Sequence, residues 1–497
     1  MKKNILKSLL FAVALTPALT GCELDQYPST SIPNENSWGS VEDAEKFANG
    51  IKSSIRSISM QDYYYADYFV DYYQITTTYG NRNGLVYNWN FQASDVEGEW
   101  SDNFSRIANA NNVINNIGNI VAETDDEQTA LNQYLGEAYV LRAWCNFSNI
   151  QRYCGRYDAS TATAANSGVP ILEESDINAK PARNTLQESY DAVLADLDKA
   201  ENLISANVTG GDAINSDVIN FLRARVYITM NDYANAYAVA TSLIEGGNYN
   251  LCQDAAELID MFTNDAGPEV VYVGAATTSE YATWNSYMHY YSTSLGAYQP
   301  DMVPSAATMN DYAAEDTRLE AYFMYVHCNN NDVECDAYLL DKFRNNEAIN
   351  ISSDDEYTRK NVPPGMRIAE MYLIAAEAAY QQGNTTDAQA YLNTLRAARG
   401  LEEISVAGNT LYNTIKTEWK REFIAEGKRL FCLKRWGDGF TRNTAAQSGA
   451  AGIIYQTNPE INIGLSVDAS NYKWTWAIPT NELETNSNMV QNPGWGN

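Results

Sequence analysis

Histidine and cysteine are scarce in this 497-residue chain, which contains two His and seven Cys. A serine or cysteine triad would have to use His289 or His327, and neither lies in a recognisable nucleophile motif. The sequence also lacks zinc-ligand spacing, a glycine-rich phosphate loop after a strand and a twelve-residue calcium loop. It therefore predicts no catalytic residue, no metal site and no cofactor.

Basic residues are also few, with 33 Lys and Arg against 63 Asp and Glu and a formal net charge of −30. Such a surface repels phosphate backbones, so nucleic acid is not an expected partner. Hydrophobic residues make up 45% of the chain and charged residues 19%, which suits a protein with a sizeable core. Because no low-complexity linker divides the chain, residues 22–497 are expected to form a single domain.

Long apolar segments are lacking beyond the N-terminus. There, three lysines precede a short apolar run at residues 9–15, and Leu19-Thr20-Gly21-Cys22 follows. The run is too short for the roughly 20 residues of a spanning helix, and the tetrapeptide resembles a lipoprotein cleavage box. We expect residues 1–21 to be a signal peptide and Cys22 to carry the lipid anchor, palmitate included. The alternative is an ordinary secretory signal with an incidental cysteine.

The other cysteines are too sparse to be the framework of a disulfide-rich fold. Cys328 and Cys335 flank a polar stretch at 329–332 and would suit a bridged hairpin loop in an exported protein. The spacing leaves open whether the two are bridged or free. The remaining cysteines lie in helical patterns and are expected to be buried thiols.

Helical periodicity covers most of the chain. Capping boxes at Ser40 and Thr185 precede amphipathic runs, and the N-terminal part, residues 22–180, reads as mainly helical. Two helical hairpins, within 184–246 and 367–400, each carry two alanines 12 residues apart across a turn, namely Ala224/Ala236 and Ala376/Ala388. This repetition predicts tetratricopeptide-like packing. The alternative is that any antiparallel helical hairpin needs small residues where its axes approach.

Residues 247–364 lose the helical period and become rich in Tyr, Asn, Asp, Gly and Thr, which is typical of loops and short strands. The C-terminal part, residues 401–497, is punctuated by Gly, Asn and Pro from Thr441 onward. The expected fold class is mainly α. We expect a tetratricopeptide-like helical-pair scaffold with long irregular loops, a few short strands, about half of the residues helical and no large sheet.

Aromatic residues are abundant, with 35 Tyr and 10 Trp against 13 Phe. Most rings thus carry a polar group, which suits a wet binding surface. A pyranose has an apolar face ringed by hydroxyls, so rings beside amide, carboxylate or guanidinium groups can bind it. Two stretches supply candidates for glycan contact, although core packing is the alternative for both. The first contains Tyr63, Tyr64, Tyr65, Tyr68, Tyr72, Tyr73, Arg82 and Trp89, and the second Tyr281, Trp284, Tyr287, Tyr290, Tyr291 and Tyr298.

Several blocks of sequence recur in a known family pattern. They are GEAY at 136–139, LRAW at 141–144, VP at 169–170, RIAEMYLIAAEA at 367–378, REF at 421–423, EGKR at 426–429, RWG at 435–437, AIP at 477–479 and QNPG at 491–494, with Glu482 and Asn486. Over nearly the whole mature length the chain resembles the SusD/RagB family of outer-membrane lipoproteins. One departure is Cys432, where the family usually has an aspartate.

Charged residues in these blocks have a structural interpretation. Arg421, Glu422, Glu426 and Arg429 recur at three- and four-residue steps, which predicts ion pairs between successive helical turns.

The resemblance implies a non-enzymatic polysaccharide-utilisation protein. It would be lipid-anchored in the outer membrane, face the cell exterior, capture oligosaccharide and deliver it to a SusC-like TonB-dependent transporter. The family's ligand residues are not a fixed motif, so none is carried over to this chain. Alternatives are RagB-like peptide capture, a scaffold that assembles other proteins, and an enzyme with paired carboxylates, which the 63 Asp and Glu leave open.

Overall fold

The structure is a computed structural model that describes residues 37–496 except 81–83, 175, 177, 205–209, 281–287, 351–358, 443–444 and 456–464. About half of the chain is helical and the strands are short, which confirms the predicted mainly α class. No helix among the described residues is long and apolar enough to cross a membrane. Cys22 and the predicted signal peptide lie outside the described residues.

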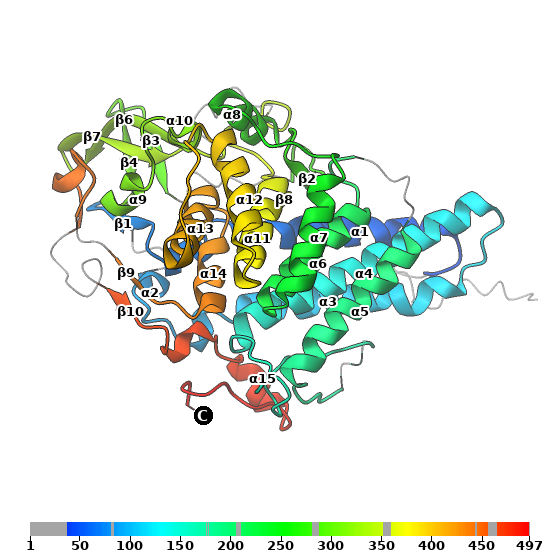
Figure 1. Ribbon diagram of the computed structural model, residues 1–497. Coiled ribbons are helices and arrows are strands. Elements are labelled where there is room, and N and C mark those ends of the chain that lie inside the picture. Colours follow the sequence, from blue (N-terminus) through cyan, green and yellow to red (C-terminus); the bar gives the residue numbers. More distant parts are fainter. Residues whose placement is uncertain are drawn as a thin grey trace, which may run out of the picture.

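Four long helices of the N-terminal part pack side by side and fill the right half of Figure 1. They are α1 (Val41–Ser59), α3 (Gly98–Asn116), α4 (Asp125–Tyr153) and α5 (Leu186–Leu203). Both predicted capping residues begin a helix, because the Ser40 side chain accepts from the Asp43 backbone N–H and Thr185 accepts from that of Glu188. Within this bundle, Arg142 on α4 pairs with Asp196 on α5 at 2.7 Å.

The predicted helical pairs are present as α6 (Ser216–Thr229) with α7 (Tyr233–Glu245), and α11 (Ile368–Gln381) with α12 (Thr385–Ala398). All four marker alanines, Ala224, Ala236, Ala376 and Ala388, are fully buried. The turns use Asn231 at φ +58° and Gly383 at φ +81°, the left-handed conformation that these residues tolerate best. Helix α11 also packs on α7, so the two pairs form one continuous stack. The tetratricopeptide-like prediction is confirmed.

The charged motif near residue 425 does not form one helix, so the predicted pairing along successive turns is wrong. Helix α13 (Gly408–Glu422) ends before it, and α14 (Lys428–Trp436) begins after a break at which Ala425 and Gly427 have φ near +70°. A Cβ on Gly427 would lie 2.3 Å from the Asp62 carbonyl oxygen, so a side chain there would clash with the chain that crosses it.

These charges pair with distant residues instead. The Glu422 carboxylate accepts from Arg318, Arg367 and Arg399, and Glu426 pairs with Lys342 at 2.6 Å and with Arg367 at 2.7 Å. All of these side chains are buried, so the network is fully desolvated, and breaking one pair would leave an uncompensated charge. The network fastens the middle segment, which supplies Arg318 and Lys342, to the helical scaffold.

The middle segment is more regular than predicted. Its strands β3 (His289–Ser292), β4 (Ala297–Pro300), β6 (Phe323–Asn330) and β7 (Val333–Leu340) form a four-stranded sheet in the order β3-β4-β6-β7, at the upper left of Figure 1. Three helices accompany it, namely α8 (Ala255–Asn264), α9 (Ala306–Asn310) and α10 (Thr317–Tyr322). One face of the sheet packs against Ala450, Ile453 and Ile454 of the C-terminal part. The hairpin expected around residues 329–332 is present, and its two strands, at eight residues each, are longer than the short strands predicted for this segment.

Smaller elements complete the chain. They are η2 (Ala66–Phe69), β1 (Tyr73–Ile75) paired with β5 (Met302–Pro304), α2 (Gly84–Tyr87), η3 (Ala93–Asp95), η4 (Ile117–Asn119), β2 (Val270–Tyr272) paired with β8 (Met366–Arg367), β9 (Phe440–Thr441) paired with β10 (Ser466–Val467), η6 (Ala450–Gly452), η7 (Tyr472–Trp474) and α15 (Thr480–Thr485). The end of the chain is fixed by Asn492, whose amide donates to the Tyr153 and Trp476 carbonyls.

Candidate functional site

The first predicted tyrosine stretch lies mostly in the core. Tyr63, Tyr64, Tyr68, Tyr72, Tyr73 and Trp89 are all 6% exposed or less. Several of their polar groups are used inside the protein: Tyr72 donates to the Lys420 carbonyl at 2.8 Å, and the Trp89 indole donates to the Phe69 carbonyl at 2.6 Å. Rings in this position have no open face for a sugar. The expectation of ligand contact is therefore corrected for these six residues, because a hydroxyl that finds a backbone acceptor can be buried.

Two other residues of that stretch have different placements. Tyr65 is half-buried, with its ring perpendicular to Phe69 at 5.6 Å and to Trp476 at 6.4 Å. Its hydroxyl donates to the Asp95 carbonyl at 3.1 Å, so it too is part of the packing. Arg82 lies outside the described residues.

The second predicted stretch falls on the four-stranded sheet where it is described. Tyr281, Trp284 and Tyr287 lie outside the described residues. Tyr290 on β3 is 47% exposed, and its hydroxyl donates to the Gln299 side chain on β4. Tyr291 and Tyr298 are half-buried and pack edge to face, with ring centroids 5.1 Å apart. Of the predicted rings that the structure describes, Tyr290 is the one that solvent reaches best.

Sequence reasoning missed two further tyrosines on the same sheet. Tyr325 on β6 is 58% exposed, and it lies directly opposite Tyr338 on β7, with ring centroids 4.9 Å apart. The neighbours of Tyr325, Met324 and Val326, pack on the buried side of the sheet. Alternation along the strand thus turns every second side chain outward. That alternation, together with the polar turn at 329–332, was the available signal.

A groove of about 470 Å³ runs along this tyrosine pair, between the hairpin and the α9–α10 segment. The described residues that line it carry no charge: Ala306, Met309, Asn310, Tyr312, Ala314, Leu319, Tyr325, Tyr338, Gln447 and Ser448. Gln447 is fixed along the edge of β7, because its side chain accepts from the Tyr338 N–H and donates to the Tyr338 carbonyl. Within the described chain, the hydroxyls of Tyr325 and Tyr338 make no hydrogen bond, so both can serve a ligand. We define this feature as the tyrosine groove.

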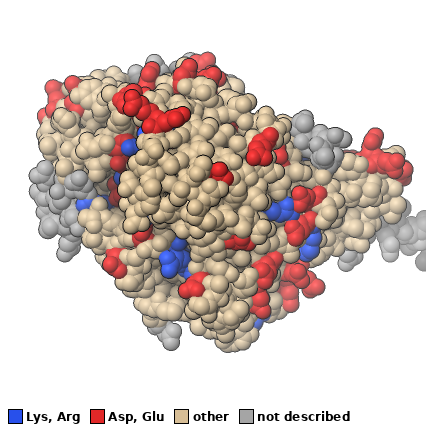
Figure 2. Space-filling view, viewed as in Figure 1, with Lys and Arg blue, Asp and Glu red and all other residues tan. Residues whose placement is uncertain are grey.

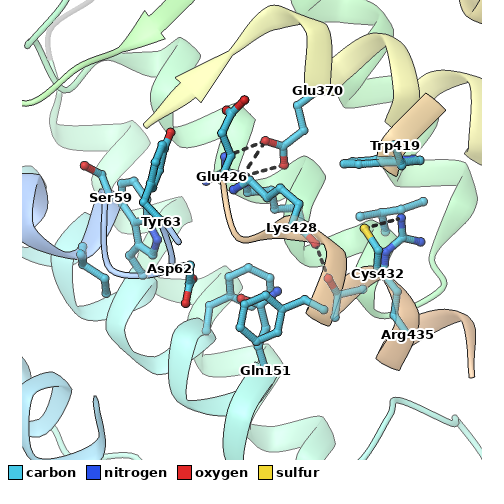
Figure 3. A pocket seen from close by; sticks show the side chains of 17 residues that line it. Ser59, Asp62, Tyr63, Gln151, Glu370, Trp419, Glu426, Lys428, Cys432 and Arg435 are labelled. Atoms are coloured by element: carbon cyan, nitrogen blue, oxygen red, sulfur yellow. Dashed lines mark hydrogen bonds and ion pairs between the residues drawn. The ribbon is translucent and has the colours of Figure 1, made fainter. Parts of the chain in front are cut away.

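A small pocket lies where α1, α4, α6, α11 and α14 meet (Figure 3), and its volume is only about 60 Å³. That space holds a few water molecules, at roughly 10–15 Å³ each, and no sugar ring. Its charges are paired, since Arg225 binds Glu370 at 2.7 Å and Arg435 binds Glu377. Burial alone would raise the pKa of Glu370, but the Arg225 and Lys428 charges outweigh it and lower that pKa. Glu370 is therefore held as a carboxylate and is unsuited to act as a general acid.

All cysteines in the described part of the chain are free thiols. Cys328 and Cys335 face each other across β6 and β7, as the predicted hairpin requires, but both are free thiols, so the bridge is not formed here. Burial lowers the pKa of His289 to about 4, and its ring contacts the Leu340 carbonyl at 2.8 Å. No group of three His, Cys, Asp or Glu side chains among the described residues is placed to hold a metal ion.

Two protein-family models match this chain. The model of the SusD family matches residues 326–495, and a model described as starch-binding associating with outer membrane matches residues 24–216. The chain belongs to the SusD family. A SusD-like protein of Formosa agariphila is 26% identical over 90% of this chain and 92% of its own length. The starch-binding protein SusD of Bacteroides thetaiotaomicron is 33% identical, over 27% of this chain and 21% of its own.

Solved structures agree with the family assignment. A putative sugar binding protein of Bacteroides vulgatus superposes with a TM-score of 0.72 at 26% identity, covering 93% of this chain and all of the other. A SusD superfamily protein of Bacteroides thetaiotaomicron shares the fold, with a TM-score of 0.73 at 24% identity over 91% of this chain and all of its own. Arg435 lies 3.8 Å from the Cys432 thiol and takes Glu377 as its partner.

Proposed function

We propose that this SusD-family chain is a non-enzymatic, cell-surface glycan-binding lipoprotein that captures oligosaccharide and passes it to a SusC-like TonB-dependent transporter. Family membership supports carbohydrate binding, since one family model is described as starch-binding and a relative is named for starch binding. Association with the outer membrane is likewise in the description of the family.

The observation that carries the proposal is the tyrosine groove. Tyr325 presents an exposed ring, Tyr338 lies 4.9 Å from it, and the described lining includes amides and hydroxyls but no charged side chain. Ring faces match the C–H face of a pyranose, and neutral polar groups match its hydroxyls. A glycosidase would need two carboxylates beside the sugar, and the described lining offers neither.

Peptide capture remains the second reading, because RagB-like relatives resemble this chain in the scaffold. A free peptide brings two charged termini, which are best met by charged or backbone groups aimed into the site. The described lining of the tyrosine groove offers no charged partner for either terminus. The groove therefore favours a neutral sugar over a peptide.

Anchoring would come from Cys22 after removal of residues 1–21. Several acyl chains on one residue hold a protein stably at a membrane, whereas a single chain does not. We expect the Cys22→Ala protein to leave the membrane fraction of fractionated cells. Protease shaving of intact cells would then report whether the anchored protein faces outward. A Cys22→Ala protein that still sediments with membranes would contradict the anchor.

A glycan and peptide array probed with the purified full-length protein in detergent tests the function itself. We expect retention of neutral oligosaccharides and none of the peptides. The Tyr325→Ala variant should lose that signal, while Tyr134→Ala, a half-buried tyrosine on α4 far from the groove, should keep it. Retention of peptides alone would favour the RagB-like reading, and release of shorter sugars during incubation would show an enzyme.

A further inference from the structure

A second groove, of about 440 Å³, lies between the C-terminal end of α14 and η7. It shares no lining residue with the tyrosine groove. In Figure 1, α14 and β10, which lie close to its lining residues, are below α9 and β7, which lie close to those of the tyrosine groove. The two grooves are therefore separate surfaces, and the second is formed by helix ends and the C-terminal segment.

One wall of this groove is the ring of Tyr472, which packs against Gly494 and Trp495. Tyr472 is 44% exposed and makes no hydrogen bond through its hydroxyl within the described chain. A Cβ on Gly494 would lie 2.5 Å from Tyr472 Cγ, so the glycine, at φ +92°, lets the ring rest against the backbone. Trp495 meets the same ring edge to face at 5.3 Å. With one face covered, the opposite face is the one that solvent and ligands can reach.

The facing wall carries a donor and an acceptor. The exposed Arg156 guanidinium lies over Gly437, where a Cβ would be 2.3 Å from Nη1, and Nη1 donates to the Trp436 carbonyl at 3.4 Å. Its other N–H groups make no hydrogen bond within the described chain. The Asp438 carboxylate accepts from Lys416 at 2.8 Å, and its side chain is 37% exposed, so it has acceptor capacity to spare.

We propose that this groove is a second oligosaccharide-binding site, for a neutral pyranoside that stacks on Tyr472 while its hydroxyls bridge Arg156 and Asp438. An acidic sugar would pair with the guanidinium but meet the Asp438 charge and a protein of net charge −30. Figure 2 shows acidic side chains scattered over the visible face with few basic ones between them. The site rests on the proposed function, because both grooves would serve the same class of ligand.

Isothermal titration calorimetry of the full-length protein with maltohexaose, cellohexaose, xylohexaose and mannohexaose tests this site, with stoichiometry as the readout. At least one hexaose should fill two sites per chain. Tyr472→Ala should weaken one site roughly ten- to hundredfold, with base stacking as the guide to the magnitude. Arg156→Gln should weaken the same site, because it removes the charged guanidinium donors. Tyr325→Ala should weaken the other site, and Tyr134→Ala should leave both unchanged.

Other outcomes separate the two proposals. A single site that Tyr325→Ala weakens and Tyr472→Ala does not would overturn this inference and leave the proposed function standing. Stronger binding of trigalacturonate than of every neutral hexaose at the site that contains Tyr472 would overturn the ligand class. No binding of any of the four hexaoses would overturn the proposed function and this inference with it. Circular dichroism of each variant checks that it remains folded.

Discussion

Two tyrosine-rich regions of this molecule differ in the burial of their rings. Rings from residues 63–89 are buried among helices, and their polar atoms donate to backbone carbonyls such as those of Phe69 and Lys420. Rings from residues 290–338 stand on a sheet whose other face is packed, so that Tyr290 and Tyr325 face solvent. Composition alone does not decide whether a tyrosine binds ligand. A tyrosine can be buried where its hydroxyl reaches a backbone carbonyl. On a strand, the alternation of side chains sets which rings face solvent.

Two carboxylates, Asp71 and Asp265, differ in whether a cation lies beside them. Burial would raise the pKa of Asp71, but Arg429 at 3.0 Å and Lys420 outweigh it and hold that pKa below its ordinary range. Asp265 has no cation within ion-pair distance among the described residues, and it accepts only from Asn346 and the Val362 N–H. Burial raises the pKa of Asp265 to about 7. Asp71 is thus paired with cations. Asp265 has no such partner among the described residues, and its pKa of about 7 lies near neutrality.

The largest effect should come from removing a buried ring of the first stretch. Trp89→Ala deletes a side chain that packs on Phe69, Phe91, Phe440 and Trp474. We expect the free energy of unfolding to fall by about 3–5 kcal/mol, with the cost set by how far the cavity collapses. Urea unfolding followed by circular dichroism measures it. A loss below about 1 kcal/mol would mean that Trp89 is not the core residue described above.

Removing an exposed ring from the four-stranded sheet should leave stability nearly unchanged and reduce binding. Tyr325→Ala removes an exposed ring, so unfolding should shift by no more than about 0.5 kcal/mol. Affinity for a neutral oligosaccharide at the tyrosine groove should fall by about 1–3 kcal/mol, with base stacking as the guide. Calorimetry and urea unfolding on the same protein separate the two quantities. If Tyr325→Ala destabilises the protein as much as Trp89→Ala does, the contrast between the stretches fails.

A gradual effect, spread over several pH units, should appear in the pH dependence of stability. Between the ordinary carboxyl pKa near 4 and about 7, folded Asp265 holds a proton that the unfolded chain has released. Its contribution therefore favours folding at low pH and is lost as pH rises to 7, with a slope of up to about 1.4 kcal/mol per pH unit. Asp265→Asn should remove that component and make the protein relatively more stable above pH 7.

The control for this experiment is Asp260→Asn, an exposed position on α8, the helix that ends just before Asp265. Unfolding free energies measured from pH 4.5 to 8 should keep the wild-type pH profile in Asp260→Asn and lose one component of it in Asp265→Asn. Identical profiles for wild type and Asp265→Asn would show that the Asp265 carboxyl is ionised throughout this range.

Much of the scaffold could be predicted from the sequence, because its signals are local. Caps at Ser40 and Thr185, and alanines spaced across the turns at Asn231 and Gly383, fix helices through neighbouring residues. The ion pairs around Glu422 could not be predicted, since its arginine partners lie 23, 55 and 104 residues away in the sequence. Local spacing suggested pairing between adjacent turns, but the break at Gly427 aims those side chains elsewhere.

The candidate site was predicted less well than the scaffold. Dense aromatics drew attention to residues 63–89, yet a tyrosine cluster is equally compatible with a core in which hydroxyls such as that of Tyr72 donate to backbone carbonyls. Tyr290, Tyr291 and Tyr298 lie on the same sheet as Tyr325 and Tyr338 but do not line the tyrosine groove, and Tyr325 and Tyr338 lie outside the two densest tyrosine stretches. They meet only through strand pairing, which joins residues 13 positions apart. A site assembled by pairing leaves little trace in local composition.

The most direct test of the central claim is a crystal structure of the Tyr472→Ala protein with a neutral oligosaccharide that the array retains. This variant weakens the second groove, so the tyrosine groove is the site that remains. We predict a sugar ring stacked on Tyr325, with its hydroxyls within hydrogen-bond distance of the neutral groups along β7 and α9. Sugar bound elsewhere on the chain, with the tyrosine groove empty and Tyr325 uncontacted, would contradict the account.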